Sequence, residues 1–146
     1  MAYDLTMRTI FADTFYWNAL ANPKDQWHQT ARRLSRELHP FLIVTTDEVL
    51  VEFLAFFSSR GKILREAAVA LTRKIQSNAN ILVIPQTRES FERGFALYEE
   101  RSDKEYSMTD CVSMETMRQR NLTEVLTHDH HFTREGFVIL LTEPDP

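Results

Sequence analysis

Short apolar runs with β-rich composition alternate along this chain with longer segments whose apolar residues recur at helical spacing. The predicted strands are residues 9–12, 41–45, 80–85, 124–126 and 137–141. Helices are predicted for residues 14–21, 25–38, 47–60, 62–77, 87–101 and 109–120. This alternation favours an α/β fold, in which a parallel sheet is covered by helices on both faces.

Local signals predict where several of the helices begin and end. Asn22-Pro23 breaks the first helix, and Pro40 ends the second. Thr45 and Glu48 have the spacing of a capping box, which places a helix start there, and Gly61 is expected to stop that helix. Three of the six predicted helices are therefore bounded by residues that stop the chain from continuing as a helix.

The strand ends are where a binding site is expected in such a fold. Right-handed crossovers place the carboxyl ends of all parallel strands at one edge of the sheet. Ligands bind at that edge, near the point where the order of the strands reverses. Candidate functional residues should therefore lie just after strands or at the starts of the following helices.

Four acidic residues meet this condition. Asp13 ends the first strand, Glu52 lies in the helix after the second, Asp110 lies in the first turn of a helix, and Asp129 follows the fourth strand. Carboxylate oxygens from separate elements can hold Mg²⁺ or Mn²⁺. Such ions generate hydroxide and stabilise a leaving oxygen in phosphodiester cleavage. Together the four acids predict a metal centre for hydrolysis.

Three of the four acids also have a purely structural interpretation. Asp13 could cap the helix that begins at Thr14. Asp110 completes a capping pattern with Ser107, and a carboxylate there also suits the helix dipole. Asp129 could be an ordinary turn residue. The sequence leaves both interpretations open at each position.

Glu52 is harder to explain as a surface residue. It shares a helix face with Val49 and Phe56, and Phe53 and Phe57 border that face. A carboxylate within an apolar stripe costs several kcal/mol unless it is paired, protonated or bound to a metal. A buried structural ion pair is the main alternative to a metal role.

Composition limits what the chain can do. Its 146 residues fit one domain, 1–146, and its single cysteine, Cys111, excludes an internal disulfide. No apolar run could span a bilayer, and the first residues lack the pattern of a signal peptide, so a cytoplasmic protein is expected. The net charge is −4. Binding of nucleic acid would then require a basic strip or bound cations.

Four stretches of the sequence resemble the motifs of the PIN-domain family, in order and over nearly the whole chain. They are Phe11-Ala-Asp13-Thr14, Val49-Leu-Val-Glu52, Tyr106-Ser107-Met-Thr-Asp110-Cys-Val-Ser113 and Val125-Leu-Thr127-His-Asp129-His-His131-Phe132. The similarity is greatest to small single-domain members, the VapC-type toxins and their free-standing relatives. One departure is Val51, where several relatives have a second acidic residue.

The resemblance implies a three-layer α/β/α fold with a five-stranded parallel sheet, and Mg²⁺- or Mn²⁺-dependent cleavage of RNA. It assigns both catalysis and metal binding to the four acids. It adds supporting roles for four further residues, namely Thr14, Ser107, Thr127 and, near an acidic position of many relatives, Asp103. It also implies a small antitoxin as partner and a homodimer, for which Phe53, Phe56 and Phe57 are candidate interface or core residues.

Other interpretations have weaker support. Asp103 stands beside Lys104 and could form a solvated ion pair. His128, His130 and His131 could suggest zinc, but no cysteine or distant histidine completes a set of four ligands, and His131 is expected to pack beside Phe132. A PIN-like module that binds RNA or protein without cutting remains the alternative function.

Overall fold

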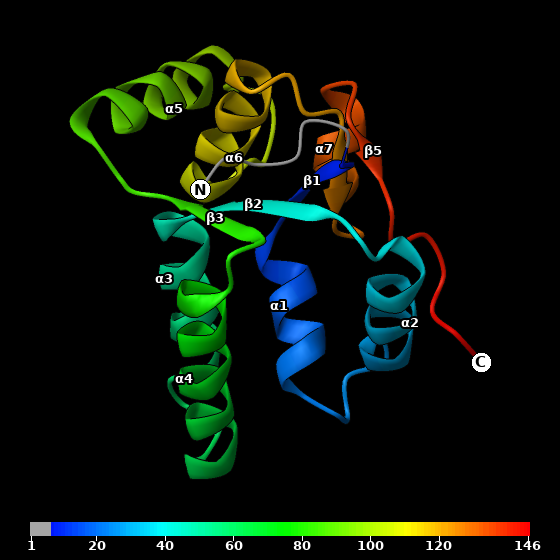
Figure 1. Cartoon of the computed structure of the whole chain (residues 1–146). Coiled ribbons are helices and arrows are strands. Elements are labelled where there is room, and N and C mark those ends of the chain that lie inside the picture. Colours follow the sequence, from blue (N-terminus) through cyan, green and yellow to red (C-terminus); the bar gives the residue numbers. More distant parts are fainter. Residues whose placement is uncertain (1–6) are drawn as a thin grey trace.

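The computed structural model describes residues 7–146 as an α/β fold (Figure 1). The strands are β1 (Thr9–Ala12), β2 (Leu42–Thr46), β3 (Ile81–Ile84), β4 (Glu124–Leu126) and β5 (Val138–Ile139). The helices are α1 (Thr14–Ala21), α2 (His28–Leu38), α3 (Asp47–Phe57), α4 (Lys62–Ser77), α5 (Arg88–Glu100), α6 (Met108–Gln119) and α7 (His130–Arg134).

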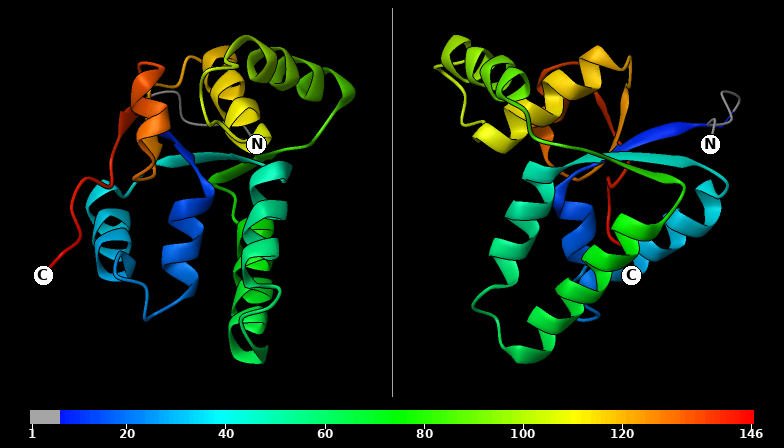
Figure 2. Two further views of the ribbon diagram at one scale, coloured as in Figure 1. Left: turned by 180° about the vertical axis from the view of Figure 1, so that it is seen from behind. Right: turned by 60° about the vertical axis from the view of Figure 1, so that its left-hand side comes forward.

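The five strands form one parallel sheet in the order β3-β2-β1-β4-β5. Helices α1 to α4 lie on one side of the sheet and α5 to α7 on the other, which confirms the three-layer architecture (Figures 1 and 2). The chain runs outward from β1 through β2 to β3 and then returns to β4 on the other side of β1. The order of the strands therefore reverses between β1 and β4, where a ligand site is expected.

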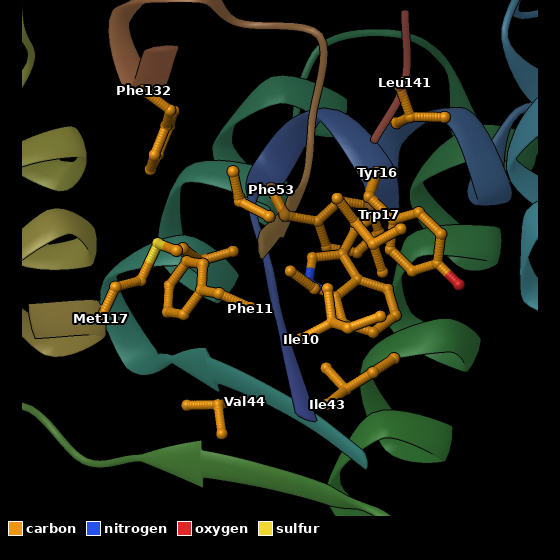
Figure 3. Packing of buried hydrophobic residues seen from close by; sticks show 14 of the residues in the cluster. Ile10, Phe11, Tyr16, Trp17, Ile43, Val44, Phe53, Met117, Phe132 and Leu141 are labelled. Atoms are coloured by element: carbon orange, nitrogen blue, oxygen red, sulfur yellow. The ribbon is translucent and has the colours of Figure 1, made fainter. Parts of the chain in front are cut away.

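The central strands are buried on both faces, which explains their uninterrupted apolar sequences. Ile10 and Phe11 are consecutive residues of β1, and neither is exposed to solvent. Ile10 lies with Trp17 on one face of the sheet, whereas Phe11 lies near Met117 on the other (Figure 3). Since successive strand residues point to opposite faces, both positions must be apolar in a sheet that helices cover on both sides.

All five predicted strands and six predicted helices are present, with small shifts at their ends. The largest shifts are in α2, which begins at His28 instead of residue 25, and in α3, which ends at Phe57 instead of residue 60. A seventh helix that was not among those predicted, α7, is formed by residues 130–134 after β4. Within residues 7–146, no helix combines the length and apolarity needed to cross a bilayer.

The predicted capping box at Thr45 and Glu48 was also wrong. Thr46 is the N-cap residue of α3, and its hydroxyl accepts a hydrogen bond from the backbone N–H of Val49 at 3.1 Å. Thr45 is still part of β2, where its buried hydroxyl donates to the carbonyl oxygen of Ala12 at 2.9 Å. The two threonines are adjacent. Because the hydroxyl of Thr45 is used within the sheet, Thr46 is the one that caps the helix.

Candidate metal centre

Asp13 and Thr127 meet where the order of the strands reverses. Asp13 directly follows β1, and Thr127 directly follows the neighbouring strand β4. The hydroxyl of Thr127 donates to Oδ2 of Asp13 at 2.9 Å. Asp13 occupies the N-cap position of α1, but its side chain makes no capping hydrogen bond. The carboxylate is therefore held at the edge of the sheet by β4 and does not serve its own helix.

The second carboxylate oxygen of Asp13, Oδ1, lies in an unusual environment for a buried polar atom. Only 4% of Asp13 is exposed, and Oδ1 is buried without a hydrogen-bond partner among residues 7–146. Buried polar atoms are nearly always hydrogen-bonded, and an orphaned one costs about 1–3 kcal/mol. A bound cation would satisfy this oxygen, so the geometry fits a metal ligand.

Asp110 is fixed by a capping box at the start of α6. Oδ2 of Asp110 accepts from the backbone N–H of Ser107 at 3.0 Å, and the N–H of Asp110 donates to the Ser107 hydroxyl, also at 3.0 Å. The structural interpretation of this motif is thus correct. It does not exclude a ligand role, because each carboxylate oxygen has two lone pairs and Oδ1 is not used by the box.

Asp129 caps the short helix that the sequence did not predict. Its Oδ1 accepts from the backbone N–H of His131 at 2.9 Å, and its own N–H donates to the Thr127 hydroxyl at 3.2 Å. Thr127 therefore contacts the carboxylate of Asp13 and the backbone N–H of Asp129. Thr127, predicted only as a supporting residue, holds two of the four candidate acids in place.

The charges of these acids affect one another. Burial is the main cause that raises the pKa of Asp13 to about 8, and the negative charge of Asp110 adds to it. The hydrogen bond from Thr127 opposes this rise, while the charge of Glu52 contributes to it. Burial also raises the pKa of Asp110, together with the charges of Asp129 and Glu52. The four carboxylates thus share one electrostatic site that favours a positive charge.

The remaining predicted residues differ in how close they come to this site. Glu52 is partly buried on α3, a helix that contacts α6. Thr14 is buried beside Asp13, and its hydroxyl has no hydrogen-bond partner among the described residues. Asp103 is not brought into the cluster, because its side chain is 73% exposed and pairs with Lys104 at 3.2 Å. The solvated-pair interpretation of Asp103 agrees with this position.

His131 belongs to the site, although it was expected to pack beside Phe132. Its Nδ1 lies 3.5 Å from Oδ2 of Asp110 and 3.4 Å from Oδ1 of Asp129. Ligand atoms of Asp110, Asp129 and His131 all lie within 4.8 Å of one another. One of the two aspartates beside His131, Asp110, is thus 21 residues earlier in the sequence and on a different helix. Only the fold brings these residues together, so no local motif could have indicated the set.

The other histidines near the motif are packing residues. The ring of His128 lies 4.5 Å from that of Trp27, and its Nδ1 forms a hydrogen bond with the carbonyl oxygen of Leu141 at 2.7 Å. His130 is exposed, and its ring contacts that of His128. Since His128 is engaged elsewhere, three adjacent histidines do not surround one ion.

Glu135 joins the elements that carry the site. Its side chain is 6% exposed and accepts hydrogen bonds from Arg101 at 3.1 and 3.2 Å, from Arg118 at 2.6 Å and from the Tyr106 hydroxyl at 2.9 Å. These residues come from the end of α5, the loop before α6, and α6 itself. The cluster therefore ties the helix of Asp110 to the segment that follows His131.

Glu135→Gln is expected to destabilise the protein by about 2 kcal/mol at pH 7, because a buried, paired carboxylate is lost. The hydrogen bond with Arg101 is the main cause that lowers the pKa of Glu135 to about 2. A lowered pKa stabilises the fold above the unfolded value, near 4.5, and this contribution disappears as the pH falls towards 2. Urea unfolding at pH 7 and pH 3 should show a smaller difference between variant and wild type at pH 3.

Glu66→Gln is the matched control for this prediction, because Glu66 forms an exposed pair with Lys62 in α4. Exposed pairs contribute little to stability, so this variant should unfold as the wild type does. Equal stability of Glu135→Gln and Glu66→Gln at pH 7 would contradict the role assigned to Glu135.

Comparison with known proteins supports the assignment of the fold and the motifs. The PIN domain family matches residues 10–138. The chain is 31% identical over 129 residues to the 23S rRNA-specific endonuclease VapC20 of Mycobacterium tuberculosis, covering 88% of this chain and 95% of that protein. The crystal structure of VapC20, described as a sarcin–ricin loop cleaving toxin, superimposes with a TM-score of 0.79 at 30% identity, covering 88% of this chain and 96% of that one.

Two more distant structures share the fold. VapBC2 from Rickettsia felis, bound to a DNA fragment from its promoter, gives a TM-score of 0.62 at 14% identity, covering 90% of this chain and 97% of that one. FitAcB from Neisseria gonorrhoeae gives 0.61 at 14% identity, covering 90% and 96%. The family match spans most of the chain, and the VapC20 similarity extends over nearly its whole length. The chain therefore belongs to the PIN-domain family.

Proposed function

We propose that this protein is a divalent-metal-dependent endoribonuclease. The observation that carries the proposal is the convergence of Asp13, Asp110 and Asp129 at the edge of the sheet, with an unsatisfied buried oxygen on Asp13. Glu52 would complete the set of four acids that hold Mg²⁺ or Mn²⁺. The chemistry of the donors fits these hard ions, which take carboxylate oxygens and keep several waters.

The chain's own residues would position the reacting groups. A bound divalent ion lowers the pKa of a water molecule and offsets the charge of the phosphodiester. The Thr127 hydroxyl holds the carboxylate of Asp13, the backbone N–H of His131 holds that of Asp129, and the Ser107 box holds that of Asp110. Ser107 thus supports the site through the helix start. Because each of the three aspartates is held by a backbone N–H or a buried hydroxyl, they need little reorganisation when substrate binds.

The proposed substrate is a loop of ribosomal RNA. The most informative relative is named for cleavage of 23S rRNA, and its structure is described as that of a toxin cutting the sarcin–ricin loop. The similarity covers nearly the whole of both chains, so the same substrate class is proposed for this protein. Cleavage of ribosomal RNA would take place in the cytoplasm. We propose that residues 1–146 act as one domain in this reaction.

The test is cleavage of RNA by the purified protein. Intact ribosomes and protein-free 23S rRNA would be incubated with Mg²⁺, with Mn²⁺, or with excess EDTA, and cuts would be mapped by primer extension. We expect a discrete cut with either ion and none with EDTA. Cleavage that persists in EDTA would rule out the metal mechanism. RNA binding without a cut under every condition would support a binding module instead.

A small antitoxin is proposed as partner, since the relative is a toxin and the fold is shared with toxin–antitoxin proteins. An Arg or Lys of the antitoxin could enter the acidic site in place of metal. Expression of this protein alone should then stop bacterial growth, and co-expression of the neighbouring small reading frame should restore it. Unimpaired growth at high expression would contradict the toxin role.

A homodimer is also proposed, through the outer face of α3. Phe53 and Phe57, considered as candidates from the sequence, are fully buried in the core. Of these three phenylalanines only Phe56, which is 40% exposed, remains available for an interface, and Val51 on the same helix is 65% exposed. Such large apolar side chains on one helix favour a protein contact. Sedimentation equilibrium of the wild type and of Phe56→Glu would test it, with a monomeric wild type as the contrary result.

A further inference from the structure

We propose that the imidazole of His131 is a ligand of the metal ion held by Asp110 and Asp129, and that this nitrogen makes the site prefer Mn²⁺ to Mg²⁺. The inference rests on the proposed metal centre and goes beyond it, since that centre is defined by carboxylates alone. It assigns a ligand of different chemistry and a consequence for which ion is bound.

The distances fit a shared ion. Two ligand atoms about 2.1 Å from an ion lie about 3.0–3.4 Å apart when the angle between them is about 90–110°. Nδ1 of His131 is 3.4 Å from Oδ1 of Asp129 and 3.5 Å from Oδ2 of Asp110. One ion can therefore lie at bonding distance from all three atoms after small side-chain rotations.

The same nitrogen is buried and has no hydrogen bond. Nδ1 of His131 lacks a hydrogen-bond partner among residues 7–146, despite the two nearby carboxylate oxygens. Each of those oxygens already accepts a backbone N–H, Asp110 from Ser107 and Asp129 from His131 itself. Oδ1 of Asp13, in the same electrostatic site, is also unsatisfied. A bound cation would satisfy the nitrogen and the carboxylate oxygens together.

The imidazole is already held at this position by its surroundings. The backbone N–H of His131 is tied to Asp129 at the start of α7. The ring lies against that of Tyr106, with centroids 5.1 Å apart, and the Tyr106 hydroxyl is bound to Glu135. Packing that fixes the orientation of a ligand raises its affinity for the metal, because less freedom is lost on binding.

A nitrogen ligand changes the preferred ion. Mg²⁺ binds oxygen ligands and keeps its waters, whereas imidazole suits first-row transition metals. A site of carboxylates plus one imidazole should therefore favour Mn²⁺ over Mg²⁺. If His131 instead only forms an ion pair with the two aspartates, its nitrogen would not contact the ion and the preference would not depend on it.

The test is pulsed electron paramagnetic resonance of the full chain loaded with Mn²⁺. Electron spin echo modulation from a directly bound ¹⁴N nucleus is expected in the wild type. His131→Gln should abolish it, as should His131→Phe, which keeps a ring against Tyr106. Both variants should bind Mn²⁺ about tenfold or more weaker, with a smaller loss for Mg²⁺. His130→Gln, a change at the exposed neighbouring histidine, should keep the modulation and the affinity.

The outcomes separate this inference from the proposed function. Mn²⁺ bound to the wild type without ¹⁴N modulation would overturn the role of His131 while leaving the carboxylate centre intact. Modulation that survives in both His131 variants would overturn it in the same way. Absence of any Mn²⁺ binding would overturn the metal centre and this inference together.

Discussion

Asp110→Asn is expected to reduce RNA cleavage by about 10³-fold or more while leaving the metal-free protein at least as stable as the wild type. Loss of one charged group in a catalytic site typically costs about 10²–10³-fold, and a metal ligand more. Asparagine is nearly isosteric, and its amide oxygen can still accept the hydrogen bond that Ser107 donates at 3.0 Å. The helix start is therefore preserved while the charge is removed.

The sign of the stability change follows from the raised pKa of Asp110, caused mainly by burial. An acid whose pKa is higher in the folded state destabilises the fold as the pH rises above the unfolded value, so a cost is present at pH 7. Removing the charge should therefore leave the free energy of unfolding without metal unchanged or higher. Thermal unfolding in EDTA, and again with Mn²⁺, would measure both effects, because ion binding should raise the wild-type Tm much more than that of the variant.

Asp103→Asn is the matched control for Asp110→Asn, because Asp103 lies in the preceding loop and is exposed beside Lys104. Cleavage and metal stabilisation should stay at wild-type levels in this variant. If Asp110→Asn unfolds the metal-free protein but the surviving folded fraction still cuts RNA, then Asp110 is only a helix cap and the site assignment is wrong.

Asp13→Asn is expected to remove most of the pH dependence of stability in the metal-free protein. Burial raises the pKa of Asp13 from 3.8 to about 8, so the wild type should become less stable as the pH rises from about 4 to 8. Between pH 5.5 and 8.0 the loss should be on the order of 3 kcal/mol. Asparagine carries no charge at either pH and can still accept the hydrogen bond from Thr127. The free energy of unfolding of the variant should therefore stay nearly constant between the two pH values.

Urea unfolding in EDTA at pH 5.5 and pH 8.0 would measure this difference. Mn²⁺ added at pH 8.0 should recover the lost stability in the wild type, because the ion neutralises the buried carboxylate of Asp13. It should change the stability of Asp13→Asn little, because that variant has no carboxylate at this position. Parallel pH profiles for wild type and variant would contradict the buried, charge-coupled position of Asp13.

Much of the fold could be predicted from the sequence because the central strands are buried on both faces. Ile10 and Phe11 are consecutive apolar residues that face opposite sides of the sheet, and this pattern distinguishes a parallel sheet from an amphipathic one. The position of the acids could be predicted because the carboxyl ends of parallel strands meet at one edge of the sheet. Asp13 directly follows the parallel strand β1, and Asp129 lies three residues after the end of β4, so both lie near the same edge.

The parts that could not be predicted depend on contacts between distant segments. Helix α7 has only five residues, and in the sequence its N-cap, Asp129, looks like an ordinary turn residue. His131 becomes part of the site only because α6 brings Asp110 to it. The start of α3 at Asp47 was predicted correctly, but its cap is Thr46 and not Thr45, because the hydroxyl of Thr45 donates to the carbonyl oxygen of Ala12. Local patterns contain none of this information.

The carboxylates at the edge of the sheet are proposed to hold a divalent ion. Crystals soaked in Mn²⁺, with anomalous data collected near the manganese absorption edge, would test it most directly. We expect a peak about 2.1–2.3 Å from carboxylate oxygens of Asp110 and Asp129, within reach of Asp13, that is absent from Asp110→Asn crystals. A peak only at other surface carboxylates such as Asp103, or none between these three aspartates at saturating Mn²⁺, would contradict the account.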